Sequence, residues 1–263
     1  MADAEPLESR RFRSAARYYL TGRPAYSPRL IQHVARMAGV TRECRVLDLG
    51  CGPGVLAGAF APLAGEVLAM DPEPEMLRIA GARFGGAGRI SFVRASSLDL
   101  SPALGRFRLV TMGRSFHWMD RAETLRRLDA IIEPGGAVAL FDSNHCDVPE
   151  NGWYADYRAL VRRYAEGDRA HIRRVSGTWV RHEAFLLDSA FCLLDEIAVI
   201  ERRQVSVRQL IDRAFSRSST APDRLDGRAE ELAHEIAALL APLGPLGPLA
   251  EVLSTSALLG SRP

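Results

Sequence analysis

The sequence predicts an α/β fold built around a doubly wound, largely parallel sheet. Short apolar runs, each long enough for one buried strand, alternate with segments of helical period. The first run, 46–49, stops at a series of glycines, and the second run, 66–70, stops at Asp71. Strands inside a parallel sheet show this pattern, and the turns at their carboxyl ends are common places for ligands to bind.

The elements follow in order from their periods and from the residues that begin and end them. A short helix is expected over 14–20, and Ser27-Pro28 predicts an N-cap and first helical residue for a helix that ends near Gly39. The further helices are expected at 54–63, 74–83, 121–132, 153–164, 179–187, 207–215 and 227–240. The strands are expected at 45–49, 66–70, 89–93, 108–112, 137–141, 194–202 and 249–259.

The turns between these elements also have sequence signals. Residues 133–136, Glu-Pro-Gly-Gly, are expected to form the turn into the fifth strand, and the polar residues 142–145 are expected to end that strand. A Pro-Gly-rich hinge at 242–248 precedes the last strand. We expect one domain over 1–263, divided into an N-terminal lid and helices (1–39), a ligand-binding core (40–145), a helical cap (146–190) and a C-terminal part of the sheet (191–263).

Composition narrows the functional class. The 263 residues are 47% hydrophobic and carry a net charge of +2, which gives no electrostatic reason to expect a nucleic-acid or membrane partner. No lysine is present, so a Walker A lysine and a pyridoxal-phosphate Schiff base are excluded. The cysteines are scattered and no signal peptide is evident, so a cytoplasmic protein without disulfides is expected.

The glycine turn after the first strand differs from a dinucleotide-binding turn. Gly50, Gly52 and Gly54 alternate, but Val55 stands where G-x-G-x-x-G needs its third glycine. Asp48 precedes the turn, and its carboxylate would repel a pyrophosphate but attract a positively charged ligand. Nucleotide binding remains the alternative.

This stretch, Val46 to Gly54, resembles motif I of the class I S-adenosylmethionine-dependent methyltransferases. The resemblance implies S-adenosylmethionine as cofactor. It implies that Asp71 holds the ribose hydroxyls. An N-cap before Pro72 is a second expected role for this aspartate, and the two roles are compatible. The other contacts that it implies are Asp48, Gly50, Gly52, Pro72 and Met76, the Ser96-Ser97-Leu98 loop at the adenine, and Gly113 after the fourth strand.

Residues 19–26, Tyr-Leu-Thr-Gly-Arg-Pro-Ala-Tyr, resemble a signature of small-molecule methyltransferases related to trans-aconitate methyltransferase. By this resemblance Arg23 would meet the methionine carboxylate and Tyr19 would lie near the sulfonium, whose charge a ring face attracts. Packing of these side chains on the surface is the alternative. The family implies a Rossmann-like seven-stranded sheet in the order 3-2-1-4-5-7-6 with an antiparallel last strand. It also implies an N-terminal lid and a cap inserted after the fifth strand.

The segment after the fourth strand, 113–120, is expected to face the reacting methyl group. His117 is a candidate general base or a neutral imidazole that shapes the pocket, and His145 is a second candidate base. Arg114 points to an anionic acceptor or to a structural ion pair. We expect no metal site at 142–145, because a polar turn is commoner there.

The expected function is methyl transfer to a small molecule, with a carboxylate or a natural product among the acceptors considered. The segment lacks the Asn/Asp-Pro-Pro-aromatic motif of DNA-base methylases. A non-methylating reaction such as cyclisation, or a cofactor-binding protein without activity, is the alternative. The sequence leaves a monomer and a homodimer open.

Overall fold

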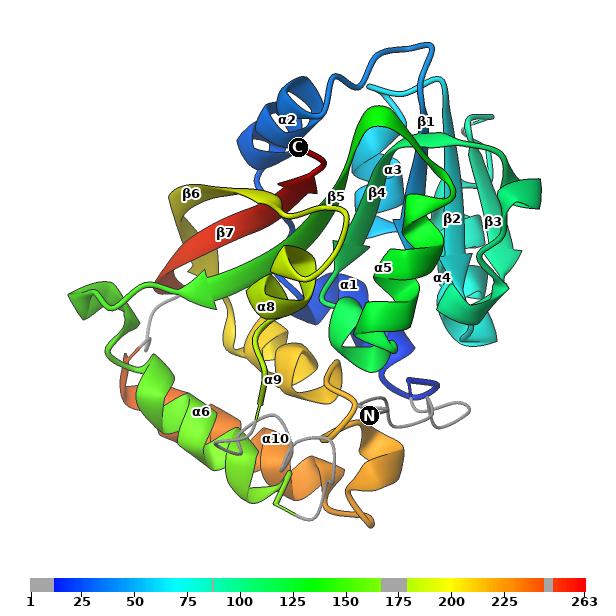
Figure 1. The fold of residues 1–263 in the computed structure, drawn as a ribbon. Coiled ribbons are helices and arrows are strands. Elements are labelled where there is room, and N and C mark those ends of the chain that lie inside the picture. The colour runs from blue at the N-terminus through cyan, green and yellow to red at the C-terminus, as the bar shows by residue number, and fades with distance from the viewer. Residues whose placement is uncertain (1–11, 87, 167–178, 244–247) are drawn as a thin grey trace.

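The computed structural model describes residues 12–86, 88–166, 179–243 and 248–263. Within these residues, seven strands form one sheet in the order β3-β2-β1-β4-β5-β7-β6 (Figure 1). The strands are β1 Arg45–Leu49, β2 Glu66–Asp71, β3 Ile90–Arg94, β4 Phe107–Gly113, β5 Ile132–His145, β6 Leu193–Val205 and β7 Leu249–Ser261. β1 to β5 pair in parallel, whereas β7 is antiparallel to β5 and β6. The predicted sheet and strand order are confirmed.

Helices cover both faces of the sheet because alternate residues of its strands point to opposite sides. Val46 packs on one side with α2 and α3, while Leu47 packs on the other with α5 and α8. The helices are α1 Ala16–Gly22, α2 Pro28–Met37, α3 Val55–Phe60, α4 Pro74–Phe84, α5 Arg121–Asp129, α6 Tyr154–Arg163, α8 His182–Leu187, α9 Val207–Phe215 and α10 Ala229–Leu240. No helix in the described parts of the chain is both long and apolar enough to cross a membrane.

A third group of helices lies beyond the sheet. Figure 1 shows α6, α9 and α10 stacked below it, and their side chains share a separate apolar core around Tyr157, Leu210 and Ile236. We call α6, α9 and α10 the helical layer. It is tied to the N-terminal helix α1, because Arg213 of α9 donates from Nε to the carbonyl of Gly22 at 3.0 Å.

The structure divides the cap predicted over 146–190. α6 joins the helical layer, but Leu186 of α8 packs on the sheet beside α5. The layer takes its other two helices, α9 and α10, from the segment 191–263 that was expected to complete the sheet. Residues 167–178 of the predicted cap, 1–11 of the predicted lid and 244–247 of the predicted hinge lie outside the described residues.

Three predicted boundaries around β5 are wrong. α5 ends at Asp129, not at 132, and the predicted turn 133–136 is part of β5, where the register with β4 shifts. The pairing passes from Phe107 opposite Ile132 to Leu109 opposite Ala137, so an irregular stretch of β5 replaces the turn. β5 does not stop at Phe141. It continues through the polar residues 142–145, because β7 pairs with them as far as His145 opposite Leu253.

Ser27 precedes α2 as predicted, but its hydroxyl does not cap the helix. It donates instead to Oε1 of Glu201 on β6 at 2.9 Å. Pro28 does occupy the first helical position as predicted, and the hydroxyl of Ser27 forms a contact between α2 and the edge strand.

Gly58 allows α3 and α4 to pack closely, and replacing it with alanine should destabilise the protein. A Cβ at Gly58 would lie 2.5 Å from the Phe84 ring, so Gly58→Ala should cost about 1–3 kcal/mol through overpacking. Gly81 on α4 is the matched control, because a Cβ there would meet nothing within 4 Å. Gly81→Ala should stabilise by about 0.4–1 kcal/mol. Urea denaturation of both variants tests this, and equal effects would contradict the packing role of Gly58.

Candidate functional site

The glycine turn after β1 folds over the end of β2. The amides of Gly50 and Cys51 both donate to the carbonyl of Met70, at 2.8 and 2.9 Å. Gly50 has φ +68°, and a Cβ on it would lie 2.5 Å from Cβ of Ser115, so no other residue fits here. Ser115 in turn donates to the carbonyl of Leu49 at 2.8 Å. The turn and the segment after β4 therefore hold each other in place, which the sequence did not indicate for Ser115.

Asp48 is buried beneath this turn and connects three elements. Its Oδ2 accepts from the amide of Ala57 in α3 at 2.9 Å, and its Oδ1 accepts from the hydroxyl of Thr111 in β4 at 3.1 Å. Burial raises the pKa of Asp48 to about 7, although both hydrogen bonds act in the opposite direction. Asp48 thus lies beside the expected cofactor site, and its hydrogen bonds in the structure fix the surrounding backbone.

Asp71 occupies the tip of β2 with both carboxylate oxygens in use. Oδ2 accepts from the amide of Gly52 and Oδ1 from the amide of Glu73, each at 2.8 Å. Each oxygen retains one further lone pair, so the carboxylate could still accept from two hydroxyl groups. Burial, opposed by these two bonds, raises its pKa to about 6.

The second expected role of Asp71, an N-cap before Pro72, is wrong. Glu73 caps α4 instead, by accepting from the amide of Glu75 at 3.3 Å. Met76 in the first turn of α4 is buried, and its sulfur would lie 3.9 Å from a Cβ on Gly52. Asp71, Gly52 and Met76 therefore meet at one place, and their role as cofactor contacts remains a prediction.

The loop after β3 is fixed by its own side chains. Ser96 and Asp99 form a capping box around a short 3-10 turn, and the amide of Leu98 donates to the hydroxyl of Ser96 at 3.2 Å. Arg127 of α5 donates to the carbonyl of Leu98 at 2.6 Å. Ser97 is buried, while the Leu98 side chain is 62% exposed and offers an apolar surface at the end of the sheet.

The segment after β4 brings Arg114 to the glycine turn. Arg114 has φ +56°, unusual for a residue with a side chain, and its amide donates to the carbonyl of Phe141 at 3.1 Å. Its guanidinium lies over the rings of Tyr26, at 5.1 Å, and Tyr19, at 5.7 Å. A small cavity of about 10 Å³ is lined by Tyr19, Tyr26, Asp48, Gly50, Cys51, Val55, Leu56, Gly113 and Arg114.

Arg23 adjoins this group from the end of α1. Its guanidinium lies 5.5 Å from the Tyr19 ring centre, and Nη2 donates to the carbonyl of Ser216 at 3.2 Å. The structure thus gathers Tyr19, Arg23 and Arg114 beside the glycine turn, although they lie up to 95 positions apart in the chain.

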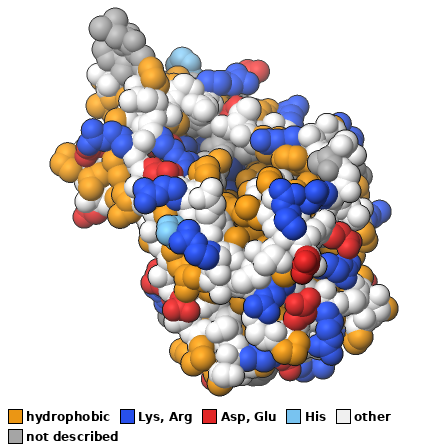
Figure 2. All heavy atoms as spheres, turned by 90° about the horizontal axis from the view of Figure 1, so that it is seen from above, with side chains coloured by type: hydrophobic (Ala, Val, Ile, Leu, Met, Phe, Trp, Pro, Cys, Tyr) orange, Lys and Arg blue, Asp and Glu red, His pale blue; other side chains and the backbone are white. Residues whose placement is uncertain are grey.

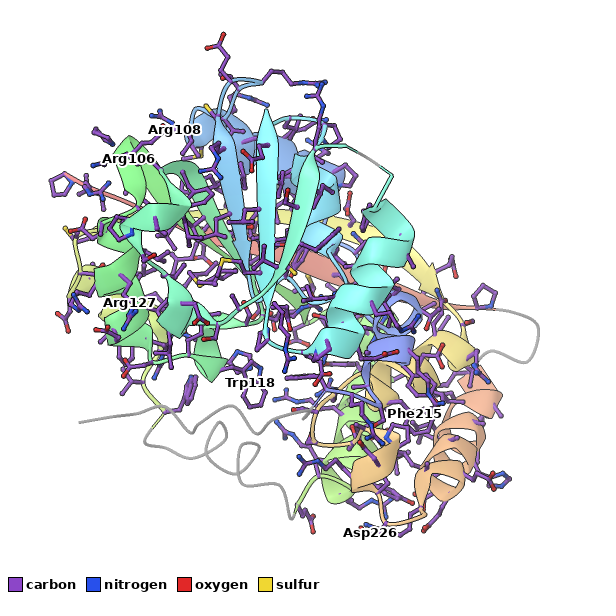
Figure 3. The ribbon with its side chains drawn as sticks, turned by 90° about the vertical axis from the view of Figure 1, so that its right-hand side faces the viewer. Arg106, Arg108, Trp118, Arg127, Phe215 and Asp226 are labelled. Carbon is purple, nitrogen blue, oxygen red and sulfur yellow. The ribbon has the colours of Figure 1, made fainter. Side chains whose placement is uncertain are left out.

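The two candidate histidines lie elsewhere and are not among the lining residues. His117 belongs to the 3-10 turn Phe116–Trp118, and its ring lies 6.5 Å from the ring of His182. In Figure 3, Arg106 and Arg108 lie at one end of the sheet and Trp118 lies at the other end. Phe215 of α9 lies toward the same end as Trp118. The role of His117 as a base remains a prediction.

His145 is buried in a charged cluster. Its Nε2 lies 3.2 Å from Oε2 of Glu251 and 3.4 Å from Nη1 of Arg213, and its ring stacks on Tyr154 at 3.5 Å. Burial lowers the pKa of His145. Since this nitrogen is already engaged, the structure offers His145 a packing role, and its proposed role as a base also remains a prediction. No group of three or more His, Cys, Asp or Glu side chains suited to a metal ion occurs among the residues described.

The matched family and two sequence relatives are methyltransferases. Residues 46–136 match a methyltransferase domain family. An uncharacterized methyltransferase of Mycobacterium tuberculosis is 26% identical over 222 residues, which cover 76% of this chain and 85% of the relative. The malonyl-[acyl-carrier protein] O-methyltransferase of Pseudescherichia vulneris is 32% identical over 130 residues, which cover 48% of this chain and 51% of the relative.

A solved methyltransferase structure has a similar fold. A SAM-dependent methyltransferase from Geobacter sulfurreducens, in complex with S-adenosyl-L-homocysteine, superposes with a TM-score of 0.53 at 15% identity, with 100% of both chains covered. At this identity the likeness concerns the fold alone.

Proposed function

Because the chain is a class I S-adenosylmethionine-dependent methyltransferase, we propose that it methylates a small molecule and that the reacting group is a carboxylate. The single observation that carries the carboxylate is Arg114, which lines the cavity at the glycine turn with its Nε buried and without a hydrogen bond among the described residues. A guanidinium matches a carboxylate in geometry and charge. The Pseudescherichia vulneris relative, of which the match spans about half, is named as an O-methyltransferase, and this supports an oxygen acceptor.

The residues around the glycine turn suit the cofactor. The two remaining lone pairs of Asp71 can accept from the ribose hydroxyls, and the exposed side chain of Leu98 can cover the adenine ring. Arg23 can bind the methionine carboxylate, and the ring of Tyr19 can face the sulfonium. Tyr19 and Arg114 line a cavity no larger than one water, so these side chains must shift when the cofactor enters.

The chemistry demands little of the protein beyond positioning. S-adenosylmethionine supplies an already activated methyl group. Holding the acceptor oxygen close and in line can lower the barrier by roughly 7–11 kcal/mol. A carboxylate is ionised at neutral pH, so no proton has to leave during attack and no general base is needed. Arg114 would orient the acceptor, and His117 would shape the pocket.

The small-molecule part of the proposal rests on charge and surface. The net charge is +2, and on the face shown in Figure 2 arginine side chains are interspersed with acidic and apolar ones. To test it, the protein is incubated with isotope-labelled cofactor and a small-molecule extract, and labelled products are identified by mass spectrometry. Label in carboxylate esters supports the proposal, and label confined to protein, DNA or RNA refutes it.

The roles of Arg114 and His117 predict different kinetic results. Arg114→Met should lower kcat/KM about tenfold to a hundredfold, because a charge-assisted hydrogen bond to the acceptor is lost. His117→Ala should change kcat/KM only a few-fold, and the wild-type rate at saturating cofactor should stay flat between pH 6 and 8. S-adenosylhomocysteine affinity, measured by calorimetry, should stay the same in the His117 variant.

Two outcomes would contradict these assignments. A loss of about 10²- to 10⁴-fold in His117→Ala, with a rate that rises through a pKa near neutrality, would make His117 a base acting on a protonated acceptor. Loss of cofactor binding in the same variant would place His117 in the cofactor site.

A further inference from the structure

The last strand in the sheet order, β6, is paired on one side only. All 13 residues from Leu193 to Val205 pair with β7 without a break in register, and no other described strand pairs with β6 (Figure 1). Its outer edge therefore presents a row of backbone N–H and C=O groups. β6 contains no proline and no bulge, two features that commonly keep such an edge from pairing with another chain.

The side chains along β6 are ordered by charge. An acidic pair, Asp195 and Glu196, comes first, and a basic pair, Arg202 and Arg203, comes near the end. The residues between the two pairs are apolar except for Glu201. A single charge would be enough to protect an edge, but this order makes the strand complementary to itself when it is read in the opposite direction.

Side chains of all three kinds are available at the surface. Asp195 and Glu196 are exposed and form no hydrogen bond or ion pair with another described residue. Arg202 forms a surface ion pair with Glu150, and its side chain is 68% exposed. Such pairs contribute little to stability, so this guanidinium can also bind a carboxylate of a partner. Ile200, in the apolar middle of the strand, is 65% exposed.

The geometry of an antiparallel sheet limits how this edge can pair with a second copy of itself. Residues directly opposite each other lie on the same face of the sheet, and successive side chains of a strand alternate between the faces. A two-fold axis that relates two identical strands must therefore pass at one residue and not between two. A contact of this kind is complete with two copies and leads to no longer chain of molecules.

An axis at Val199 places both acids opposite both bases. Asp195 then lies opposite Arg203 of the second copy, and Glu196 lies opposite Arg202 of the second copy. The symmetry repeats each pair, and one kind of pair lies on each face of the sheet. The apolar residues between the charged pairs meet one another in the middle.

No other axis gives this match. An axis at Ala198 would place Asp195 opposite Glu201, and an axis at any charged residue would place that charge opposite itself. Axes at Ile197 and Ile200 would form no ion pair. Opposite charges across strands stabilise the pairing and like charges destabilise it, so the register at Val199 is selected.

We propose that the protein forms a homodimer in which β6 pairs antiparallel with β6 of a second copy, about a two-fold axis at Val199. The two sheets of seven strands then become one continuous sheet. The interface lies at the edge away from β1 and β2, whose ends carry the glycine turn and Asp71, so each copy retains its own site.

Charge reversal tests the interface and its register. Glu196→Arg places arginine opposite arginine, and Arg202→Glu places glutamate opposite glutamate, so each variant alone should dimerise about tenfold or more weakly than wild type. An equimolar mixture of the two variants should form a heterodimer of wild-type affinity, because every arginine then lies opposite a glutamate. The double variant with both changes should dimerise like wild type for the same reason.

Sedimentation velocity over a concentration series, at low and constant ionic strength, measures these affinities. Glu43→Arg is the matched control, because it makes the same charge change at an exposed residue before β1 and should leave dimerisation unchanged. Both substituted residues of β6 are exposed, so each variant should keep the wild-type melting temperature.

Three results would each overturn the inference. The first is a wild-type protein that stays monomeric throughout the series. The second is a dimer that either single reversal leaves unchanged, or that Glu43→Arg weakens equally, since the contact would then lie elsewhere. The third is a failure of the mixture and of the double variant to recover the affinity, which would exclude the register at Val199.

Discussion

Replacing Arg213 with methionine should lower the free energy of unfolding by about 3–5 kcal/mol, because it breaks a buried ion pair from one side. The side chains of Arg213 and Glu251 are 6% and 4% exposed, and Nη1 and Nη2 donate to the two carboxylate oxygens at 2.8 and 3.2 Å. Nε holds the carbonyl of Gly22. One guanidinium thus joins α9, β7 and α1, and its loss leaves a carboxylate buried beside the imidazole of His145 alone.

Urea denaturation at pH 7 measures the effect, and two further variants interpret it. Arg78→Met breaks an exposed pair with Glu75 on α4 and should cost less than about 1 kcal/mol. The double change Arg213→Met with Glu251→Leu should recover much of the loss, since no unpaired charge remains. If Arg213→Met cost no more than Arg78→Met, the buried pair would not hold the helical layer.

The Arg213→Met substitution should also change how the stability of the protein depends on pH. Burial raises the pKa of Glu251, but hydrogen bonds from His145 and Arg213 outweigh burial and lower it to about 2. Since the pKa is depressed on folding, the stabilisation is present above about pH 4.5 and is lost as the pH falls toward 2. Arg213→Met should show a smaller loss in this interval than wild type.

Asp71→Asn should weaken S-adenosylhomocysteine binding at least about tenfold and up to about a thousandfold. The ionised carboxylate can accept from both ribose hydroxyls, each bond contributing roughly 1.5–3 kcal/mol, whereas an amide has only one accepting atom. Titration calorimetry at pH 7.5 measures the difference. Asp156→Asn, on the exposed side of α6, removes a carboxylate elsewhere and should have no effect.

The pH dependence of binding gives a second test of Asp71. Burial raises its pKa to about 6, so the carboxylate is ionised above that pH and protonated below it. Wild-type affinity should fall as the pH decreases from 7 to 5, whereas the affinity of the Asp71→Asn variant should be nearly flat, because it lacks the titrating carboxylate. An equally steep fall in both would assign the effect to another group, with Asp48 as the first candidate because its pKa lies near 7.

Much of the fold between residues 40 and 145 follows from local sequence. The apolar run that ends in glycines places the turn after β1, and the run that ends at Asp71 places the acid at the tip of β2, because in parallel strands these ends share one edge of the sheet. The predicted strand 45–49 and helix 207–215 match β1 and α9 residue for residue. The seven-stranded order came from the family resemblance, and the structure confirms it.

Long-range contacts decided the rest. β5 continues past Phe141 to His145 because β7, more than 100 residues later, pairs with it there, and no local pattern carries that information. Long-range contacts also decided which side chains lie beside the cavity at the glycine turn. The sequence singled out Arg23 and Arg114, but only the fold brings both guanidinium groups over one ring, that of Tyr19. Sequence alone thus determined the glycine turn and the acidic tip of β2, which depend on neighbouring residues. Tertiary structure decided which tyrosines and arginines lie beside them, because Tyr19, Arg23 and Arg114 are up to 95 positions apart.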